Sequence, residues 1–412
     1  CCLFFLSLLL GAAGSISSIT AKAADWPAWR YDSARSATSP HAIPQKLSLQ
    51  WIRQFAPPKP AWPEDTRLVF DGSYEPVVVG STLFLASAQN DSITALDTHS
   101  GAEKWKFFAE GPIRFAPVSA DNRLYFGSDD GCIYCLANEN GELLWRFKAA
   151  PAARRVIGND RMSSVLPVRG GPAIADGKLY FTVGVWPFEG TFLYWLDLAK
   201  IATGVSPDSA FGVVSLTDMT PQGYLVESDG NLFIPCGRAT VGLFDIAAEE
   251  LAPLSYDSRG LTDYFVTASK KWLFHGQRVI DLETKAMLPI SAPRPVSDGS
   301  EFYIAQGDNL VAADILKQPQ PKPAQGNRPP EPPSFKASWF IKAQQIKKAL
   351  GAISAARYQE GELTVDIKAG KRIYGRWGNA IYAAEPPSGD RPAEVTWATV
   401  IDGTPTALVA AD

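Results

Sequence analysis

Two stretches of eleven residues repeat one pattern forty positions apart. Residues 95–105 read ALDTHSGAEKW and residues 135–145 read CLANENGELLW, so glycine and tryptophan hold the same places in both copies. A fixed period of this length is typical of repeat folds, in which each repeat is one supersecondary unit. Because a single unit cannot bury both of its faces, the units have to stack on one another.

The pattern around these stretches recurs along the chain. Each copy has an apolar strand, a polar turn, a strand of the Leu-Tyr-Phe kind, a second turn, and a third strand that ends near an acid. Seven copies are found, at residues 75–97, 116–137, 171–197, 223–245, 264–281, 294–314 and 363–385. Asp and Gly in the turns suit tight hairpins, because these residues reach positive φ at low cost.

The sequence therefore predicts an all-β fold, a β-propeller of four-stranded blades. Eight blades are the first expectation, because residues 406–412 start an eighth copy and a strand around Trp51 precedes the first full copy. We expect that strand to complete the last blade, which is otherwise incomplete in this chain. A seven-bladed ring is the alternative.

Three segments fall outside the repeats. Residues 1–23 are apolar and end in Ala-Lys-Ala, which predicts a secretory signal peptide that is truncated at its N-terminus. The propeller then covers residues 24–412, with no transmembrane span in the mature chain. Residues 316–334 are rich in proline and predict an extended surface insert. Residues of about 335–354 have apolar side chains at helical spacing and predict a short helix on the rim.

Composition excludes several functions. With 39 basic and 43 acidic residues the net charge is −4, so a nucleic-acid partner is not expected. The Cys132–Cys135 pair has metal-ligand spacing, but residues i and i+3 of a strand point to opposite faces. The three histidines fall in unrelated places, and no catalytic, cofactor-binding or metal-binding residue is predicted.

The first stretch resembles the tryptophan-docking motif A-x-D-x-x-T-G-x-x-x-W of quinoprotein dehydrogenases. The same motif marks the wider group of PQQ-like (pyrroloquinoline-quinone-like) propeller repeats, which includes BamB, an outer-membrane assembly lipoprotein. Ser100 replaces the threonine of the motif in the first copy. The residues that we expect to dock neighbouring blades are Asp97, Gly101, Trp105, Gly141 and Trp145. Later copies keep mainly the acid, as Asp197, Asp245, Asp281 and Asp314.

This resemblance implies two classes of function. The dehydrogenases bind PQQ with calcium in the channel, and many carry adjacent cysteines beside the quinone. The only adjacent pair here, Cys1 and Cys2, lies in the signal segment, and no local motif matches the calcium ligands. We therefore expect an exported, non-enzymatic scaffold for binding or assembly, periplasmic or extracellular, without a cofactor. The alternatives are a PQQ- and calcium-dependent oxidoreductase, or a propeller module of a longer enzyme.

The loop between the second and third copies is rich in arginine. Guanidinium groups beside an aromatic ring hold carboxylate, phosphate or sulfate by forked hydrogen bonds and stacking. The predicted ligand-binding residues are Arg154, Arg155, Arg161, Arg169 and Trp186. The ligand is expected to be a protein, or an anionic small molecule or glycan. Alternatively, these arginines pair with local acids and only fix the loop.

Overall fold

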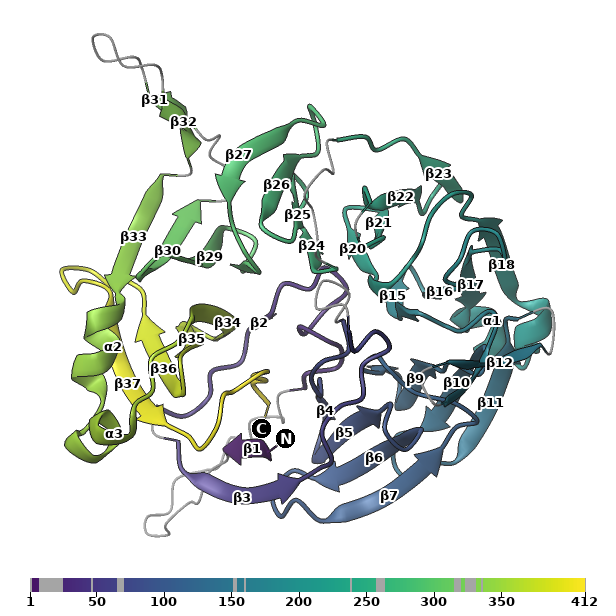
Figure 1. Cartoon of the computed structure of the whole chain (residues 1–412), viewed down its shortest axis with the longest axis horizontal. Coiled ribbons are helices and arrows are strands. Elements are labelled where there is room, and N and C mark those ends of the chain that lie inside the picture. Colours follow the sequence, from purple (N-terminus) through teal and green to yellow (C-terminus); the bar gives the residue numbers. More distant parts are fainter. Residues whose placement is uncertain are drawn as a thin grey trace.

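The strands form a ring of radial sheets around a central axis (Figure 1). The computed structural model describes residues 2–6, 25–45, 47–64, 70–150, 154–158, 161–237, 239–256, 264–314, 320–322, 331–334 and 336–411. Six four-stranded sheets and one five-stranded sheet lie in this part of the chain. The predicted all-β propeller fold is confirmed.

Each blade is a meander whose strands follow one another along the chain. The first three blades are β4–β7 (Val77–Val79, Thr82–Ser87, Ser92–Asp97, Glu103–Phe108), β8–β11 (Val118–Ala120, Arg123–Gly127, Cys132–Ala137, Leu143–Lys148) and β15–β18 (Ala173–Ala175, Lys178–Val183, Phe192–Asp197, Phe211–Ser215). The next two are β20–β23 (Val226–Ser228, Asn231–Ile234, Gly242–Asp245, Glu250–Ala252) and β24–β27 (Val266–Ala268, Trp272–His275, Arg278–Asp281, Met287–Ser291). The last two are β28, β29, β30 and β33 (Val296–Ser297, Glu301–Gln306, Asn309–Asp314, Ala337–Lys342) and β34–β37 (Leu363–Ala369, Arg372–Trp377, Ala380–Glu385, Glu394–Val400).

The hairpin turns have the backbone geometry that the sequence predicts. In the turns that open the third and fourth blades, Asp176 and Gly177 have φ of 45° and 70°, and Asp229 and Gly230 have φ of 53° and 77°. Positive φ at both central residues gives the turn twist that matches two antiparallel strands. These turns lie at one end of the strands, and the connections between blades lie at the other.

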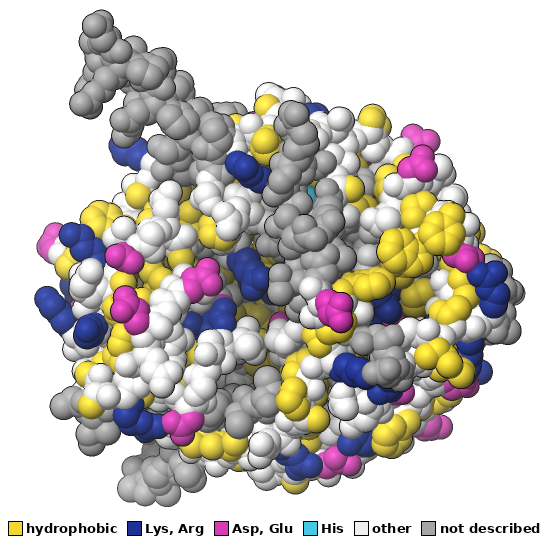
Figure 2. Space-filling view, in the orientation of Figure 1, with side chains coloured by type: hydrophobic (Ala, Val, Ile, Leu, Met, Phe, Trp, Pro, Cys, Tyr) yellow, Lys and Arg dark blue, Asp and Glu magenta, His cyan; other side chains and the backbone are white. Residues whose placement is uncertain are grey.

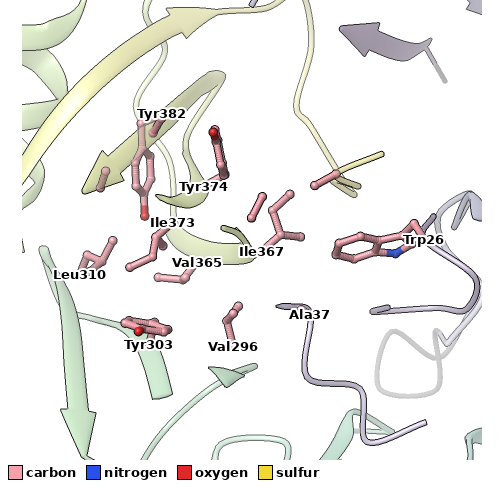
Figure 3. Close-up of a cluster of buried hydrophobic side chains, with 14 of the residues drawn as sticks. Trp26, Ala37, Val296, Tyr303, Leu310, Val365, Ile367, Ile373, Tyr374 and Tyr382 are labelled. Carbon is pink, nitrogen blue, oxygen red and sulfur yellow. The ribbon is translucent and has the colours of Figure 1, made fainter. Parts of the chain in front are cut away.

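The core is built from side chains that neighbouring blades bury against each other. Cys132 and Cys135 illustrate this, because both are buried on β10 but belong to different hydrophobic clusters, on opposite sides of the second blade. The prediction that they point to opposite faces is confirmed. Figure 3 shows the cluster that joins the N-terminal segment to the sixth and seventh blades, with Trp26, Val296, Tyr303, Val365 and Ile367.

Tryptophans on outer strands lie against the turn of the next blade. Trp105 of β7 donates from Nε1 to the carbonyl oxygen of Asn138 at 3.0 Å. A Cβ atom on Gly141 would lie 2.6 Å from the indole ring, so only glycine fits beneath it. Trp51, on β3 (Leu49–Gln54), repeats the arrangement on Gly101, where a Cβ would lie 2.7 Å away. The repeated glycine and tryptophan are therefore two halves of one contact between blades.

The repeated acid caps the turn after the third strand of a blade. Asp97 accepts hydrogen bonds at Oδ1 from the N–H groups of His99 and Ser100, at 3.1 and 2.9 Å. The same cap is made by Asp197 to Lys200, by Asp245 to Ala247 and Ala248, and by Asp281 to Glu283 and Thr284. The acid persists in later copies because the turn needs it even where no tryptophan docks.

Ring closure differs from the prediction in one respect. The seventh blade is complete, because β37 is its own fourth strand and β2 (Thr38–Ser39) adds a fifth strand parallel to β34. The described partner of β3 is β1 (Cys2–Leu6), which belongs to the predicted signal segment, and not a strand near residues 406–411, which form none. Residues 7–24, with the predicted cleavage site, lie outside the described residues. The number of blades in a complete ring stays a prediction.

The segment after β30 also departs from its predicted boundaries. Residues 335–354 do not form one helix: Ala337–Lys342 is the outer strand of the sixth blade, and helices α2 (Ala343–Ala349) and α3 (Ala352–Arg357) follow it. The strand forms because the edge of β30 offers a ladder of hydrogen bonds that outweighs local helical spacing. Of the proline-rich insert, β31 (Gln320–Lys322) and β32 (Glu331–Ser334) form an antiparallel pair that projects from the ring (Figure 1).

Candidate functional site

An additional hairpin interrupts the connection between the second and third blades. Strands β12 (Arg155–Gly158) and β13 (Arg161–Ser164) pair antiparallel and belong to no blade. The loop at residues 184–190, between β16 and β17, lies next to the foot of this hairpin, because Arg154 pairs there with Glu189. We call residues 154–158, 161–164 and 184–190 the hairpin surface.

Ion pairs fix the hairpin surface to the ring. Each arginine of the hairpin segment reaches an acid on a different connection or turn, so the segment is tied down on three sides. The pairs are Arg154 with Glu189 at 2.6 Å, Arg155 with Glu110 at 2.5 Å, and Arg161 with Asp91. These three arginines therefore pair with nearby acids, as the alternative interpretation of the loop expects. That they bind a ligand stays a prediction.

The fourth predicted arginine, Arg169, lies in a buried network. Its Nε and Nη2 donate to Asp129 at 2.6 and 2.9 Å, and Arg114 bridges Asp129 and Asp71 at 2.6 and 2.7 Å. Burial would raise the pKa of Asp129, but the two guanidiniums outweigh it and lower that pKa. For Asp71, burial prevails over Arg114 and raises the pKa. This network holds segments together and offers no open face to a ligand.

The hairpin surface exposes large apolar side chains. Ile157 is 78% exposed and Met162 51%, while Trp186 is 47% and Phe188 82% exposed. The rings of Trp186 and Phe188 stack at 6.2 Å, and Trp62 lies edge-on to Trp186 at 5.9 Å. Figure 2 shows hydrophobic side chains gathered at the right of this face, over the blades drawn in teal in Figure 1. Exposed apolar groups in such a cluster are typical of a contact surface.

A small basic hollow opens at the foot of the hairpin. Its volume is about 130 Å³, and its lining residues are Glu110, Asp130, Cys132, Arg146, Lys148, Arg154, Arg155 and Ser164. Glu110 accepts hydrogen bonds from Arg146 and Arg155, which lower its pKa. Asp130 accepts from the hydroxyl of Tyr134 at 2.5 Å. Four cations thus face two carboxylates that are already engaged.

A second cavity, of about 200 Å³, lies in the axial channel. Trp29 stacks on Tyr224 at 3.9 Å, and the guanidiniums of Arg30 and Arg294 lie over the ring of Phe265 at 4.9 and 5.4 Å. Burial lowers the pKa of Arg30 to about 10. The channel lining is therefore aromatic and charged.

The acids of this channel do not fit a calcium-bound quinone. Both carboxylate oxygens of Asp366 are held by Arg376, at 2.6 and 2.8 Å, and Glu75 accepts from the hydroxyl of Ser73 at 2.7 Å. Burial raises the pKa of Glu75, which disfavours the charged form that a calcium ion needs. In the described part of the chain no three His, Cys, Asp or Glu residues gather as metal ligands. The expectation that no cofactor binds stays a prediction.

Sequence reasoning placed the arginines and Trp186 in one segment but missed several residues of the site. Ile157 and Phe188 gave no signal beyond being apolar in a polar loop. Asp129 lies in a turn, as the aspartates of the repeats are expected to, but its carboxylate is fully buried against Arg114 and Arg169. The predicted docking residue Trp145 lies half-buried, and the centre of its ring is 5.8 Å from the centre of the Tyr125 ring.

The sequence is similar to one known protein family over part of its length. Residues 16–182 match the family model described as outer membrane protein assembly factor BamB. No curated protein matches the sequence. Among the described residues no helix is long and apolar enough to cross a membrane.

Solved structures share the fold over most of the chain. A europium-containing methanol dehydrogenase superimposes with a TM-score of 0.53 and 12% identity, covering 92% of this chain and 86% of that chain. The quinohemoprotein alcohol dehydrogenase from Comamonas testosteroni gives 0.53 and 12% identity, covering 94% and 74%. BamB from Moraxella catarrhalis gives 0.33 and 14% identity, covering 80% and 83%.

At such identities the matches to the two dehydrogenases show the fold alone. The family match over residues 16–182 and the docking contacts described above agree with that fold. The chain therefore has a β-propeller fold, and its residues 16–182 are similar to the BamB family of PQQ-like repeat proteins.

Proposed function

We propose that this protein is an exported, non-enzymatic propeller that binds a protein partner on the hairpin surface. The observation that carries the proposal is the exposure of Ile157, Met162, Trp186 and Phe188 on segments that ion pairs hold in place. Water-exposed apolar rings and chains of this size are costly unless a partner covers them. A fixed loop also loses little conformational entropy when it binds.

The composition of the surface favours a protein over a small molecule. Aromatic residues, methionine and arginine are enriched at protein interfaces, and all three kinds occur here within residues 154–188. The apolar side chains project outward, whereas small ligands prefer concave sites that enclose most of their surface. The match of residues 16–182 to an outer-membrane assembly factor supports a protein partner and an envelope location.

Site-specific photo-crosslinking in the exporting cell tests the proposal. A photoreactive amino acid replaces Ile157 or Phe188, and the control position is Thr284, an exposed residue in a turn at the other end of the strands. We expect one adduct mass shared by the two test positions and no adduct at Thr284. The partner is then purified, and Met162→Asp should weaken its binding roughly tenfold by placing a charge in the apolar contact. Equal adducts at all three positions, or none, would refute the proposal.

A separate measurement distinguishes this function from a quinoprotein dehydrogenase. PQQ and Ca²⁺ are added together to the purified protein, and Tm and dye reduction are followed with an alcohol present. We expect neither a shift in Tm nor dye reduction, because the acids of the channel do not fit the pair. A ligand that binds only the folded state raises Tm. A dose-dependent rise in Tm would therefore favour the oxidoreductase.

A further inference from the structure

We propose that the partner pairs a β-strand with the free edge of β12, and that an acidic side chain of that strand enters the basic hollow. This inference rests on the proposed function and names the chemistry of the partner. The hairpin would become a three-stranded sheet with the partner as its third strand. Recognition of this kind takes its affinity from main-chain hydrogen bonds and its specificity from alternate side chains.

The register of the hairpin shows which main-chain groups are free. Arg155 is opposite Ser164, and the N–H of Val165 donates to the carbonyl oxygen of Arg154 at 3.1 Å. In an antiparallel ladder, hydrogen-bonded pairs alternate along the strands. Val156 therefore bonds across the hairpin, while the N–H and C=O groups of Arg155 and Ile157 point away from β13. No backbone hydrogen bond joins those outward groups to another described residue.

The edge of β12 lacks the charged residues that the outer strands β7 and β11 carry along their length. All four residues of β12 are exposed, whereas β13 ends in two buried serines. On the outer strand β7, Lys104 and Lys106 flank the central tryptophan. Charged side chains of this kind discourage a second strand from pairing. On β12 the one charge, Arg155, lies at the foot of the hairpin and is turned to Glu110.

The hollow supplies the charge that selects the partner. Arg146 and Arg155 share the single carboxylate of Glu110. Lys148 makes no ion pair with any described residue and is exposed at the end of β11. The hollow therefore has more cations than acids, and its volume of about 130 Å³ suits a carboxylate side chain rather than a larger group. A guanidinium or ammonium next to a carboxylate gives a strong, charge-assisted hydrogen bond.

These features define the sequence of the incoming strand. Arg155 and Ile157 are two residues apart, so their side chains lie on the same face of the hairpin. The partner residue opposite Arg155 should be acidic, and the residue two positions along, opposite Ile157, should be apolar and preferably β-branched. Direct cross-strand pairs of these kinds stabilise a sheet. The partner is thus an extended segment with one acid and alternating apolar residues.

A labelled peptide with the sequence Thr-Val-Thr-Glu-Thr-Val-Thr is the probe, and binding is followed by fluorescence anisotropy at low salt. We expect saturable binding that weakens roughly tenfold when Lys replaces Glu in the peptide. Two further peptides are N-methylated, one on the threonine amides and one on the amides between them. Only one of these two sets faces the hairpin, so one peptide should bind and the other should not.

Protein variants complete the test. Ile157→Pro removes an outward N–H and should abolish binding, whereas Ile157→Val keeps both the N–H and an apolar side chain and should retain it. Lys148→Glu should weaken binding of the peptide that contains Glu and strengthen binding of the peptide that contains Lys. No binding, or equal loss for both methylated peptides, would overturn strand pairing. If crosslinks form at Ile157 in that case, the protein-binding function stands and only the strand inference falls.

Discussion

Replacing Gly141 by Ala tests whether the blades are held by indole rings lying on glycines. An added Cβ at this position would lie 2.6 Å from Cε3 and 2.7 Å from Cδ2 of Trp105, closer than carbon atoms approach. Gly141 also has a φ of +71°, in the left-handed region that side chains with a Cβ disfavour. Gly177 is the matched control, because its φ is +70° and no atom lies within 4 Å of an added Cβ.

The two costs can be separated by comparing these glycines. A left-handed φ costs an alanine about 1–2 kcal/mol, which applies equally to Gly141→Ala and Gly177→Ala. Forcing a methyl group into a packed contact costs a further ~1–3 kcal/mol, which applies to Gly141 alone. We therefore expect Gly141→Ala to lower the free energy of unfolding by about 2–5 kcal/mol, and Gly177→Ala by only the backbone cost of about 1–2 kcal/mol.

Urea unfolding followed by tryptophan fluorescence and by far-UV circular dichroism measures both variants. A double mutant with Trp105→Ala completes the cycle, because removing the ring should remove the extra cost at Gly141 and leave only the backbone cost. Equal destabilisation by Gly141→Ala and Gly177→Ala would refute the docking contact. A full penalty for Gly141→Ala in the Trp105→Ala background would refute it as well.

Three other predictions concern buried and turn-capping groups. Asp129→Asn should lower the free energy of unfolding by about 3–5 kcal/mol, since it leaves the buried Arg169 without a carboxylate and Arg114 with Asp71 alone. The lowered pKa of Asp129 means that its contribution to stability is present above about pH 4 and is lost as the pH falls through that lowered pKa. The urea midpoints of the two proteins should therefore approach each other as the pH falls below about 4, and a constant difference would contradict this sign. Burial raises the pKa of Cys132 and Cys135 to about 12, so a thiol reagent should label them only after the protein unfolds in urea. Rapid labelling of the native protein would show instead that the two thiols are accessible. Asp97→Ala should cost about 1 kcal/mol by removing the cap of its turn, measured as a fall in urea midpoint, and no change would mean that solvent replaces the cap.

Most of the fold could be predicted from patterns among residues that are close in sequence. The period, the turns and the acids at the ends of third strands are set by residues close in sequence, so the blades could be predicted from repeated short-range signals. The segment at 337–342 shows where this stops. Its spacing also suits a helix, and only the exposed edge of β30, more than twenty residues earlier in the chain, makes it a strand. Pairing at a distance outweighed local propensity.

The site was less predictable because its geometry depends on pairs that are far apart in sequence. Arg155 meets Glu110, and Arg161 meets Asp91, across 45 and 70 positions. A cluster of arginines in the sequence does not reveal which acids face it. For the same reason the exposure of Ile157 could not be predicted: an apolar residue in a loop is buried or exposed according to how that loop is anchored.

The buried network below the hairpin is better explained by positioning than by stability. Two arginines and two aspartates pay a desolvation cost that apolar side chains of similar volume would avoid, so a buried network of this kind is weak evidence for stabilisation. Its four members come from four separate segments of the chain. The network also reaches a fifth segment, because Asp71 accepts from the N–H of Ala61 and Arg114 donates to the carbonyl oxygen of Lys59. Arg169 lies on the chain that returns from the hairpin to the third blade. The network thus fixes where that chain leaves the ring, and a fixed exit is what an exposed strand edge needs if it is to meet a partner in one register.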